Sequence, residues 1–170
     1  MKITLKPLKG LICEEQTVSF GDTREMIEKV LGKPQIWGTS LYYFQNVMRL
    51  DFDENGGLEF IEILMPEPSL RLELYGLDPF AAPANDVVAL LAKKNDGKVT
   101  DCDNGYCVAF CEIAVGLYRD TIPEDAADLI GEAEADGKPL TQEEIEAELS
   151  KANHWCTVGI GIRGYYERRI

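Results

Sequence analysis

The chain has 170 residues, 45% of them hydrophobic, and a formal net charge of −13 at pH 7. This length and composition predict a folded protein of one domain or two small packed units, and they exclude wholesale disorder. Phosphates repel so acidic a surface, so nucleic acid and anionic membranes are excluded as nonspecific partners and a basic partner is favoured. The N-terminal sequence carries no apolar run typical of a signal peptide, and no stretch approaches the roughly 20 apolar residues that span a bilayer. We therefore expect a cytoplasmic protein.

The first part of the chain predicts one short helix, preceded by a strand and a loop over residues 3–20. Asp22 and Glu25 have the spacing of a capping box, in which two side chains satisfy free amide groups at a helix start. Gly32 is expected to end this helix, and Pro34 prevents its continuation. Between these signals, apolar residues recur at helical spacing, namely Met26, Ile27, Val30 and Leu31.

An antiparallel sheet is predicted to follow this helix. Residues 41–44 and 47–52 are rich in the Tyr, Phe and Val side chains that favour strands. The polar sequence Asn55-Gly56-Gly57 predicts a turn, after which the chain returns as a second strand. The pattern breaks at Pro66 and Pro68. Alternating apolar residues then indicate a further strand, namely Leu70, Leu72 and Leu74.

The second half of the chain echoes the first. At a constant offset of 60, three apolar residues of the first helix region (Phe20, Ile27 and Leu31) match Phe80, Val87 and Leu91. At an offset of 50, five residues of the first hairpin match Asp101, Asp103, Phe110, Glu112 and Ile113. The simplest interpretation is a duplicated unit, and chance matching is the alternative. We predict an α+β fold of two related helix-plus-antiparallel-sheet units, residues 1–76 and 77–170, with the helices packed on one face of the sheet.

Three further elements are predicted towards the C-terminus. Residues 113–119 favour a strand, and an acidic connection follows it. Thr141 and Glu144 form another capping box and predict a surface helix that ends near Ala152. A final strand is expected over residues 155–165, with glycine at alternate positions. Glycines in such positions mark close approach by another element.

Residues 51–62 formally match the calcium-binding loop of an EF-hand, including the final Glu. That loop needs a helix on each side to hold its ligands. Here the preceding residues favour a strand, and Pro66 and Pro68 leave no room for an exiting helix. A hairpin with polar turn residues is the preferred interpretation, and we expect no metal ion and no cofactor.

The five cysteines are an odd number without CxxC spacing, which indicates reduced thiols rather than a disulfide framework. Cys102, Cys107 and Cys111 are close in sequence, and the last two are expected on one face of a strand. A structural zinc site would need His154 and Cys156 from a distant strand to complete it. Because free cysteine is among the most buried residue types, we expect these side chains to fill the core.

Catalysis has little support in the sequence. The chain holds a single histidine, His154, and no P-loop, GxSxG or HExxH motif. A pair formed by His154 with Cys13 or Cys156 is one alternative. A hydrolase built on two carboxylates is another. We expect that the protein is not an enzyme.

Negative charge is concentrated between Asp120 and Glu148, where eleven acidic residues accompany one lysine and the local balance is −10. One interpretation is that this segment only keeps the protein soluble. The other is that its carboxylates contact a basic surface of a partner protein, since such complementarity raises association rates and selects partners. The candidate contact residues are Glu124, Asp125, Asp128, Glu132, Glu134 and Asp136.

Aromatic residues near the C-terminus supply a second set of candidate contacts. Trp155, Tyr165 and Tyr166 lie close in sequence to several arginines, and aromatic and arginine side chains are typical anchors of protein interfaces. The alternative is that they are ordinary sheet and terminal residues.

A resemblance to known proteins follows from two stretches. FGDTREMIEKVLGKP, followed by strands ending in RLDFDENGGLEFIEI, resembles the helix-and-sheet unit of the beta-lactamase-inhibitor-protein and BamE-like fold group. A phrase of the type G-x-[ST]-x-x-[ED]-[VI]-x-x-x-L-G-x-P opens each unit there. The residues at the corresponding positions here are Gly21, Thr23, Met26, Ile27, Leu31, Gly32 and Pro34, of which Met26 departs from the acidic residue of the phrase. The second half has no counterpart of Gly32 or Pro34. The ending HWCTVGIGIRGYYERR is similar to the ends of small bacterial immunity proteins for polymorphic toxins.

The resemblance implies a tandem-unit α+β protein that grips another protein and inhibits it by occlusion, without a catalytic residue. We therefore predict a cytoplasmic inhibitor of the immunity-protein type, which neutralises a toxin domain with a basic surface. The alternatives are a housekeeping protein-binding module or assembly factor, and an acidic mimic of nucleic acid. The oligomeric state is left open.

Overall fold

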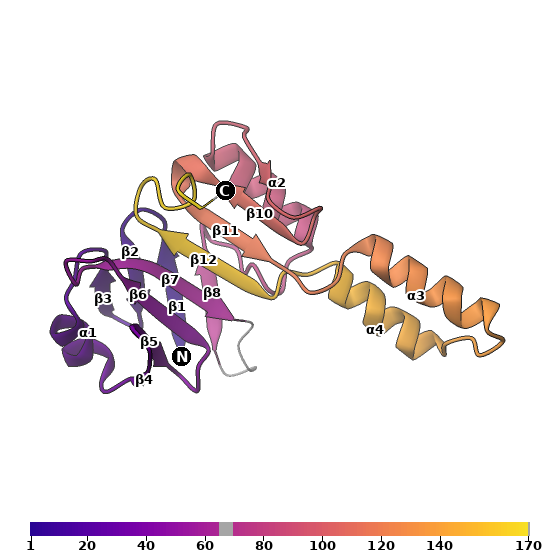
Figure 1. The fold of residues 1–170 in the computed structure, drawn as a ribbon, viewed down its shortest axis with the longest axis horizontal. Helices are drawn as coiled ribbons and strands as arrows, with labels where there is room; N and C mark the ends of the chain where they lie inside the picture. Colours follow the sequence, from indigo (N-terminus) through magenta and orange to yellow (C-terminus); the bar gives the residue numbers. More distant parts are fainter. Residues whose placement is uncertain (65–69, 170) are drawn as a thin grey trace.

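The computed structural model describes residues 1–64 and 70–169. In these ranges the chain forms four α-helices, one short 3-10 helix and two β-sheets, of four and eight strands (Figure 1). The predicted α+β class is confirmed. Buried side chains from both sheets and from helices α1 and α2 form one hydrophobic cluster, so the two sheets share a core. Among the described residues, no helix is long and apolar enough to cross a membrane.

The smaller sheet has the strand order β3-β2-β1-β8. Strands β1 (Lys2–Lys6), β2 (Gly10–Cys13) and β3 (Gln16–Ser19) pair antiparallel, and β8 (Arg71–Leu74) pairs parallel with β1. The predicted strand at residues 70–74 is therefore confirmed. The proline break before it falls on Pro66 and Pro68, which lie outside the described residues.

The prediction of one strand and a loop over residues 3–20 is wrong, because this stretch forms three strands. The two turns between them place Leu8 at φ 64° and Glu14 at φ 54°. Such positive φ values are usually taken by Gly or Asn, so neither Leu8 nor Glu14 marks its turn in the sequence. Gly10, the first residue of β2, has no room for a side chain, since a Cβ there would lie 2.1 Å from the Val18 carbonyl oxygen in β3.

Helix α1 (Arg24–Leu31) lies where the apolar stripe predicts it. Its N-cap is Thr23, whose hydroxyl accepts a hydrogen bond from the Met26 amide, and not Asp22 as the capping-box spacing suggests. The Asp22 carboxylate instead accepts a hydrogen bond from the Ser19 amide at 2.7 Å. The helix ends at Gly32, as predicted, with φ 84°.

The larger sheet is antiparallel throughout and has the order β4-β5-β6-β7-β12-β11-β10-β9. The predicted hairpin at Asn55-Gly56-Gly57 is confirmed. Pairing of β7 with β12 joins residues of both predicted units in one continuous sheet. The strands are β4 (Gln35–Trp37), β5 (Ser40–Tyr43), β6 (Met48–Phe52), β7 (Leu58–Leu64), β9 (Thr100–Asp101), β10 (Cys107–Phe110), β11 (Val115–Tyr118) and β12 (Thr157–Gly161).

Strand pairing gives the larger sheet two different faces. One face carries apolar side chains that belong to the core, among them Leu50, Ile61 and Ile160. The opposite face carries a row in which Arg49, Glu62, Gly159 and Gly116 are successive neighbours across four strands. Helix α2 (Ala84–Lys94) adds Ala84, Val87 and Leu91 to the buried residues.

The acidic connection predicted after residue 119 contains a helix that the sequence analysis did not predict. Helix α3 (Pro123–Ala135) contains apolar residues at helical spacing, but the many carboxylates between them hide the pattern. Helix α4 (Gln142–Ala152) is confirmed together with its capping box, in which Thr141 and Glu144 bond each other's backbone amides. The two helices lie side by side and project away from the sheets as an arm (Figure 1).

Candidate functional site

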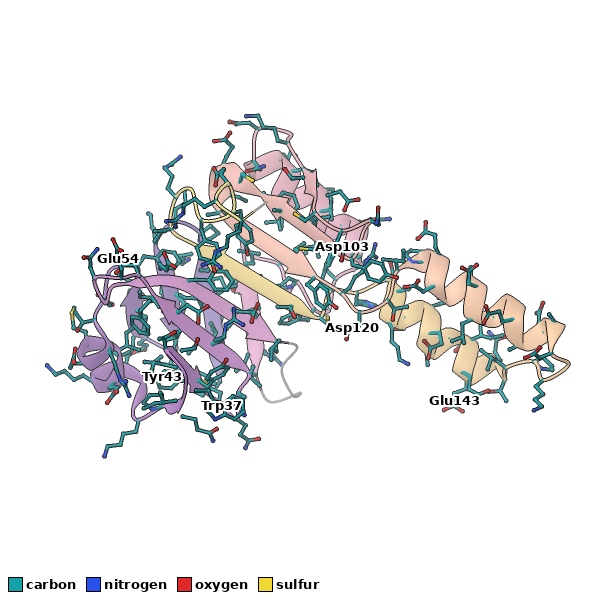
Figure 2. All side chains as sticks on the ribbon, in the orientation of Figure 1. Trp37, Tyr43, Glu54, Asp103, Asp120 and Glu143 are labelled. Atoms are coloured by element: carbon teal, nitrogen blue, oxygen red, sulfur yellow. The ribbon has the colours of Figure 1, made fainter. Side chains whose placement is uncertain are left out.

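The projecting helical pair, residues 123–152, is hereafter called the acidic arm. It contains ten acidic residues and two lysines, a net charge of −8. Figure 2 shows Asp120 at the junction between the sheet and the arm, and Glu143 on α4, well away from the sheets. Five of the six acidic residues predicted as contacts are exposed, namely Glu124, Asp128, Glu132, Glu134 and Asp136.

Asp125, the sixth predicted contact, has a structural task at the base of the arm. Its Oδ2 accepts a hydrogen bond from the Ile122 amide at 3.0 Å and another from the Tyr106 hydroxyl at 2.6 Å. The Ile122 amide, followed by the Tyr106 hydroxyl, lowers the pKa of Asp125. A carboxylate that satisfies an amide at a helix N-terminus also interacts favourably with the helix dipole. Asp125 therefore holds the first turn of α3 to the turn between β9 and β10.

Arg119 anchors the C-terminal end of the arm, which also lies at its base. Its Nη1 donates to the carbonyl oxygen of Ala152, the last residue of α4, at 2.6 Å. Its Nε donates to the Gly105 carbonyl oxygen at 3.0 Å, in the same turn that holds Tyr106. The guanidinium group also lies 4.9 Å from the Trp155 ring centre, which is a cation–π distance. One arginine thus joins the sheet, its turn and the end of α4.

The arm has only a thin apolar seam. Ala126 and Ala152 are buried near its base, whereas Leu129 and Leu149 keep 44% and 48% of their surface exposed. These two leucines lie at about the same distance from the tip, since α3 runs outward and α4 returns. They leave apolar surface exposed among the carboxylates of the arm.

Most carboxylates of the arm form no ion pair in the part of the chain that the structure describes. In the described ranges, the ion pairs within the arm are limited to Lys151 with Glu148, at 2.5 Å. Glu144 accepts from Thr141, and Glu146 accepts from Gln142 at 2.8 Å. The remaining exposed carboxylates on α3 are free to attract a cationic surface over a Debye length of about 8 Å at physiological salt.

Two of the three aromatic residues predicted as surface anchors, Trp155 and Tyr165, are buried, which corrects the prediction for them, whereas Tyr166 is half-buried. Trp155 is 2% exposed, and its Nε1 donates to the Ala84 carbonyl oxygen at 3.1 Å. Tyr165 is 3% exposed and stacks on Phe60 with ring centres 4.3 Å apart and nearly parallel planes. Burial of these rings in the fold leaves them no surface for a partner.

Tyr166 packs closely against Gly116 of β11 and Gly159 of β12, which are paired neighbours in the larger sheet. A Cβ on Gly116 would lie 2.3 Å from the Tyr166 hydroxyl oxygen, and one on Gly159 would lie 2.6 Å from it. A Cβ on Gly161 would lie 2.6 Å from the Tyr165 side chain. The prediction that the alternating glycines of the last strand mark close approach by another element is confirmed. That element is the C-terminal turn, which covers this face of the sheet.

A hollow of about 700 Å³ lies at the base of the arm and is lined by Phe80, Asp120, Thr121, Ser150, Lys151, His154 and Cys156. It contains one of the Cys–His pairs considered from the sequence. Burial, followed by the charge of Asp120, raises the pKa of Cys156, and its thiol donates to the Tyr118 carbonyl oxygen at 3.3 Å. A catalytic cysteine nucleophile needs a lowered pKa, so that the thiolate is abundant near neutral pH. The raised pKa of Cys156 therefore gives no support to a catalytic Cys–His pair at this site.

The expectation that the clustered cysteines fill the core is wrong. Cys102 is exposed and Cys107 and Cys111 are half-buried, whereas Cys13 is the cysteine that lies in the core. Cys107 and Cys111 also do not share a strand, because Cys111 begins the short 3-10 helix Cys111–Ile113. Within the described ranges, no group of three or more His, Cys, Asp or Glu side chains is arranged to hold a metal ion.

The segment that matches a calcium loop consists of the end of β6, the turn after it and most of β7, so strands rather than helices flank the turn. Asp53 Oδ1, a presumptive ligand in the motif, accepts hydrogen bonds from the amides of Asn55 at 2.8 Å and Gly57 at 3.0 Å. The carboxylate thus shapes the turn, as the hairpin interpretation requires.

Comparisons of the chain with protein-family models, with curated proteins and with solved structures find no match. The resemblance to the beta-lactamase-inhibitor-protein and BamE-like fold group therefore stays a prediction.

Sequence reasoning missed three features of the site. Tyr106 and Arg119 gave no signal, because their roles depend on contacts between residues far apart in the chain. The exposed leucines of the arm were detectable in principle, since Leu129 lies at helical spacing from Ala126 and Ala133. Recognising α3 as a helix was the missing step.

Proposed function

We propose that this chain is a protein-binding inhibitor of the immunity-protein type, which acts in the cytoplasm and engages a basic surface of a toxin domain through its acidic arm. The observation that carries the proposal is the concentration of charge −8 on a helical pair that projects from the sheets. Occlusion of a partner requires shape and charge but no catalytic group, and no step of this function needs a cofactor or a metal.

The charge distribution supports the arm rather than the whole surface as the binding element. Of the net charge of −13, the arm contributes −8, so the rest of the chain carries only −5. Complementary charges steer association and raise its rate, and desolvated apolar side chains supply much of the affinity. Leu129 and Leu149 lie among the arm's carboxylates and provide such side chains. Nucleic acid and anionic membranes are unsuitable partners for the same electrostatic reason.

The test uses the protein product of a toxin gene adjacent to the gene for this chain. Its binding is measured by calorimetry at low and high salt, with the wild type and with an arm variant, Asp128→Asn, Glu132→Gln and Glu134→Gln. The expected result is an affinity that falls with salt and falls at least tenfold in the arm variant. A matched control neutralises three exposed carboxylates elsewhere, Glu15→Gln, Glu54→Gln and Asp96→Asn.

The control separates local complementarity from net charge, because both variants change the net charge by the same amount. Equal loss of affinity in the two variants would reject the arm as the binding surface. If both variants bind the toxin with the affinity of the wild type, the protein binds through another surface and the arm is rejected as the binding surface. Failure of the adjacent product to bind at all would reject the inhibitor proposal and favour a housekeeping module.

We also propose that residues 1–76 and 77–170 are related units with their helices packed on one face of the sheet. Two turns support this. Asp53 accepts from amides two and four residues later, and Asp101 does the same with Asp103 at 3.1 Å and Gly105 at 3.0 Å. In the structure Asp53 corresponds to Asp101, an offset of 48 residues. The sequence match at an offset of 50 is therefore shifted by two residues at these turns. Relatives of this chain are expected to keep Asp at both positions, and relatives in which only one turn retains it would contradict the proposal.

A further inference from the structure

Cys102 and Cys107 lie opposite each other across the hairpin formed by β9 and β10. The ladder pairs Thr100 with Ala109 and Asp101 with Val108, and the next step of the same register brings the two cysteines together. The Cys102 amide donates to the Cys107 carbonyl oxygen at 2.9 Å, which extends the ladder by one bond. Opposed residues in antiparallel strands have Cα atoms about 4.5–5.5 Å apart, and disulfides span about 4.4–6.8 Å.

The two side chains also point to the same side and are accessible. Directly opposed residues of paired strands share a face. The Cys102 thiol donates to the Thr100 carbonyl oxygen at 3.6 Å. It also lies close enough to Cys107 that, after the larger effect of burial, each cysteine affects the pKa of the other. Cys102 is exposed and Cys107 is half-buried, so a small thiol reagent has access to the pair from the Cys102 side.

We propose that Cys102 and Cys107 form a reversible intrachain disulfide when the chain meets a small-molecule disulfide oxidant. The Cys102 thiolate attacks one sulfur of the oxidant, forms a mixed disulfide and releases one small thiol. The Cys107 thiolate then attacks the Cys102 sulfur and releases the second small thiol. Two electrons pass from the protein dithiol to the oxidant, and the two thiol protons end on the two released thiols.

The pair is positioned to affect the base of the acidic arm. Between the two cysteines runs the turn Asp103-Asn104-Gly105-Tyr106, whose Tyr106 hydroxyl bonds Asp125 and whose Gly105 carbonyl oxygen accepts from Arg119. A bond between Cys102 and Cys107 closes a short loop around this turn and restricts it. The disulfide itself does not depend on the proposed binding function, because its formation is measured on the isolated chain.

The pH dependence follows from the environments of the two thiols. Burial, followed by the neighbouring Cys102, raises the pKa of Cys107 to about 11, and burial raises the pKa of Cys102 as well. The acidic groups that face the pair are Asp101 and Asp103, the Cys111 thiol lies near Cys102, and the Tyr166 hydroxyl lies near both cysteines. Because the thiolate is the attacking species, the oxidation rate is expected to rise steadily from pH 7 towards pH 10.

The experiment incubates the full chain with glutathione disulfide and then alkylates the remaining thiols in denaturant. The expected product has lost two hydrogen atoms, leaves three of its five cysteines open to alkylation, and yields a crosslinked peptide that joins Cys102 to Cys107. Dithiothreitol is expected to reverse it. Cys102→Ser and Cys107→Ser should each stop at a glutathione mixed disulfide, whereas Cys111→Ser should still form the crosslink.

Three outcomes would overturn the proposal: a stable mixed disulfide on the wild type, a crosslink to Cys111 in place of this pair, or disulfide-linked dimers. Faster backbone amide exchange in residues 103–106 after oxidation would overturn the proposed restriction of the turn. Loss of toxin binding in an unoxidised arm variant concerns the proposed function alone and has no bearing on this site.

Discussion

The Tyr106 hydroxyl lies 2.6 Å from Oδ2 and 2.7 Å from Oδ1 of Asp125, and it donates a hydrogen bond to this carboxylate. The contact joins the turn between β9 and β10 to the first turn of α3. Together with the bond from Arg119 to the Ala152 carbonyl oxygen, it ties both helices of the acidic arm to the sheet. The arm is therefore held at its base while its carboxylates extend into solvent.

Removing the Tyr106 hydroxyl tests this attachment. In Tyr106→Phe, we expect faster amide hydrogen exchange in the first turns of α3 at neutral pH, since Asp125 keeps its bond to Ile122 but loses its bond to the sheet turn. The pKa of Asp125 is lowered, so its contribution is present above the ordinary carboxyl pKa and is lost as the pH falls through the lowered value. The difference between variant and wild type should therefore disappear in acid.

Tyr75→Phe is the matched control, because Tyr75 is exposed and contacts Lys94 of α2 rather than the arm. Its exchange pattern in α3 should equal that of the wild type. Equal exchange in Tyr106→Phe and wild type at neutral pH would mean that the tyrosine does not hold the arm.

The close contact of Tyr166 with Gly116 and Gly159 predicts that one added methyl group lowers the stability of the fold. Gly116→Ala places a Cβ 2.3 Å from the Tyr166 hydroxyl oxygen, and overpacking of this kind costs about 1–3 kcal/mol. In a Tyr166→Ala background the same substitution should cost far less. Urea denaturation of the four proteins of this cycle measures the coupling, and strictly additive effects would contradict the contact.

Gly131, within the arm, is a glycine at which the same change to alanine should have the opposite effect on stability. No atom lies within 4 Å of a Cβ added there, and the residue is in the interior of α3. Gly131→Ala should therefore stabilise the helix by about 1 kcal/mol through its higher helix propensity. Circular dichroism during thermal unfolding provides the measurement, and a lower melting temperature would be inconsistent with the described helix.

Trp155 is predicted to act in folding rather than in binding. Trp155→Phe removes the bond to the Ala84 carbonyl oxygen and the contact with Arg119, and leaving a buried acceptor unsatisfied costs about 1–3 kcal/mol. Trp37 is 60% exposed and is a matched control. Trp37→Phe should leave the free energy of unfolding nearly unchanged. Acrylamide should quench the fluorescence of Trp155→Phe, in which Trp37 remains, more strongly than that of Trp37→Phe.

Tyr165 predicts a loss of stability at alkaline pH. Burial raises its pKa to about 12 from 10.0. The neutral ring is therefore favoured in the folded state, and the stability it supports is complete below pH 10 and is lost as the pH rises towards 12. Tyr165→Phe should show a smaller fall in the free energy of unfolding over this range. A fall as steep as that of the wild type would assign the effect to other groups, such as Tyr43, whose pKa is also raised to about 12.

Local sequence signals correctly predicted the elements that begin or end at a recognisable helix cap or turn. Gly32 ends α1, Asn55-Gly56-Gly57 joins β6 to β7, and Thr141 with Glu144 begins α4, because each of these residue types satisfies a local backbone requirement. The strands at residues 2–19 were missed where Leu8 and Glu14 adopt positive φ, which their side chains disfavour. Local rules fail at such positions because tertiary packing imposes the conformation.

The candidate site was harder to predict than the fold. Charge identified the acidic segment, but composition alone does not distinguish an exposed carboxylate such as Glu132 from Asp125, which caps a helix. Trp155 and Tyr165 are residue types common at interfaces, yet Trp155 is buried and bonded to the Ala84 carbonyl oxygen, and Gly161 leaves room on the sheet for the Tyr165 ring. Which aromatic side chains reach the surface is decided by long-range strand pairing.

The most direct test of the acidic arm as the binding surface is hydrogen exchange of the complex with the toxin identified by the binding experiment. Backbone amides are compared, by mass spectrometry, between the free chain and the bound chain. The proposed function predicts that protection on binding is concentrated in residues 123–152, around Leu129 and Leu149. Protection confined to the sheets, with exchange in the arm unchanged, would contradict it.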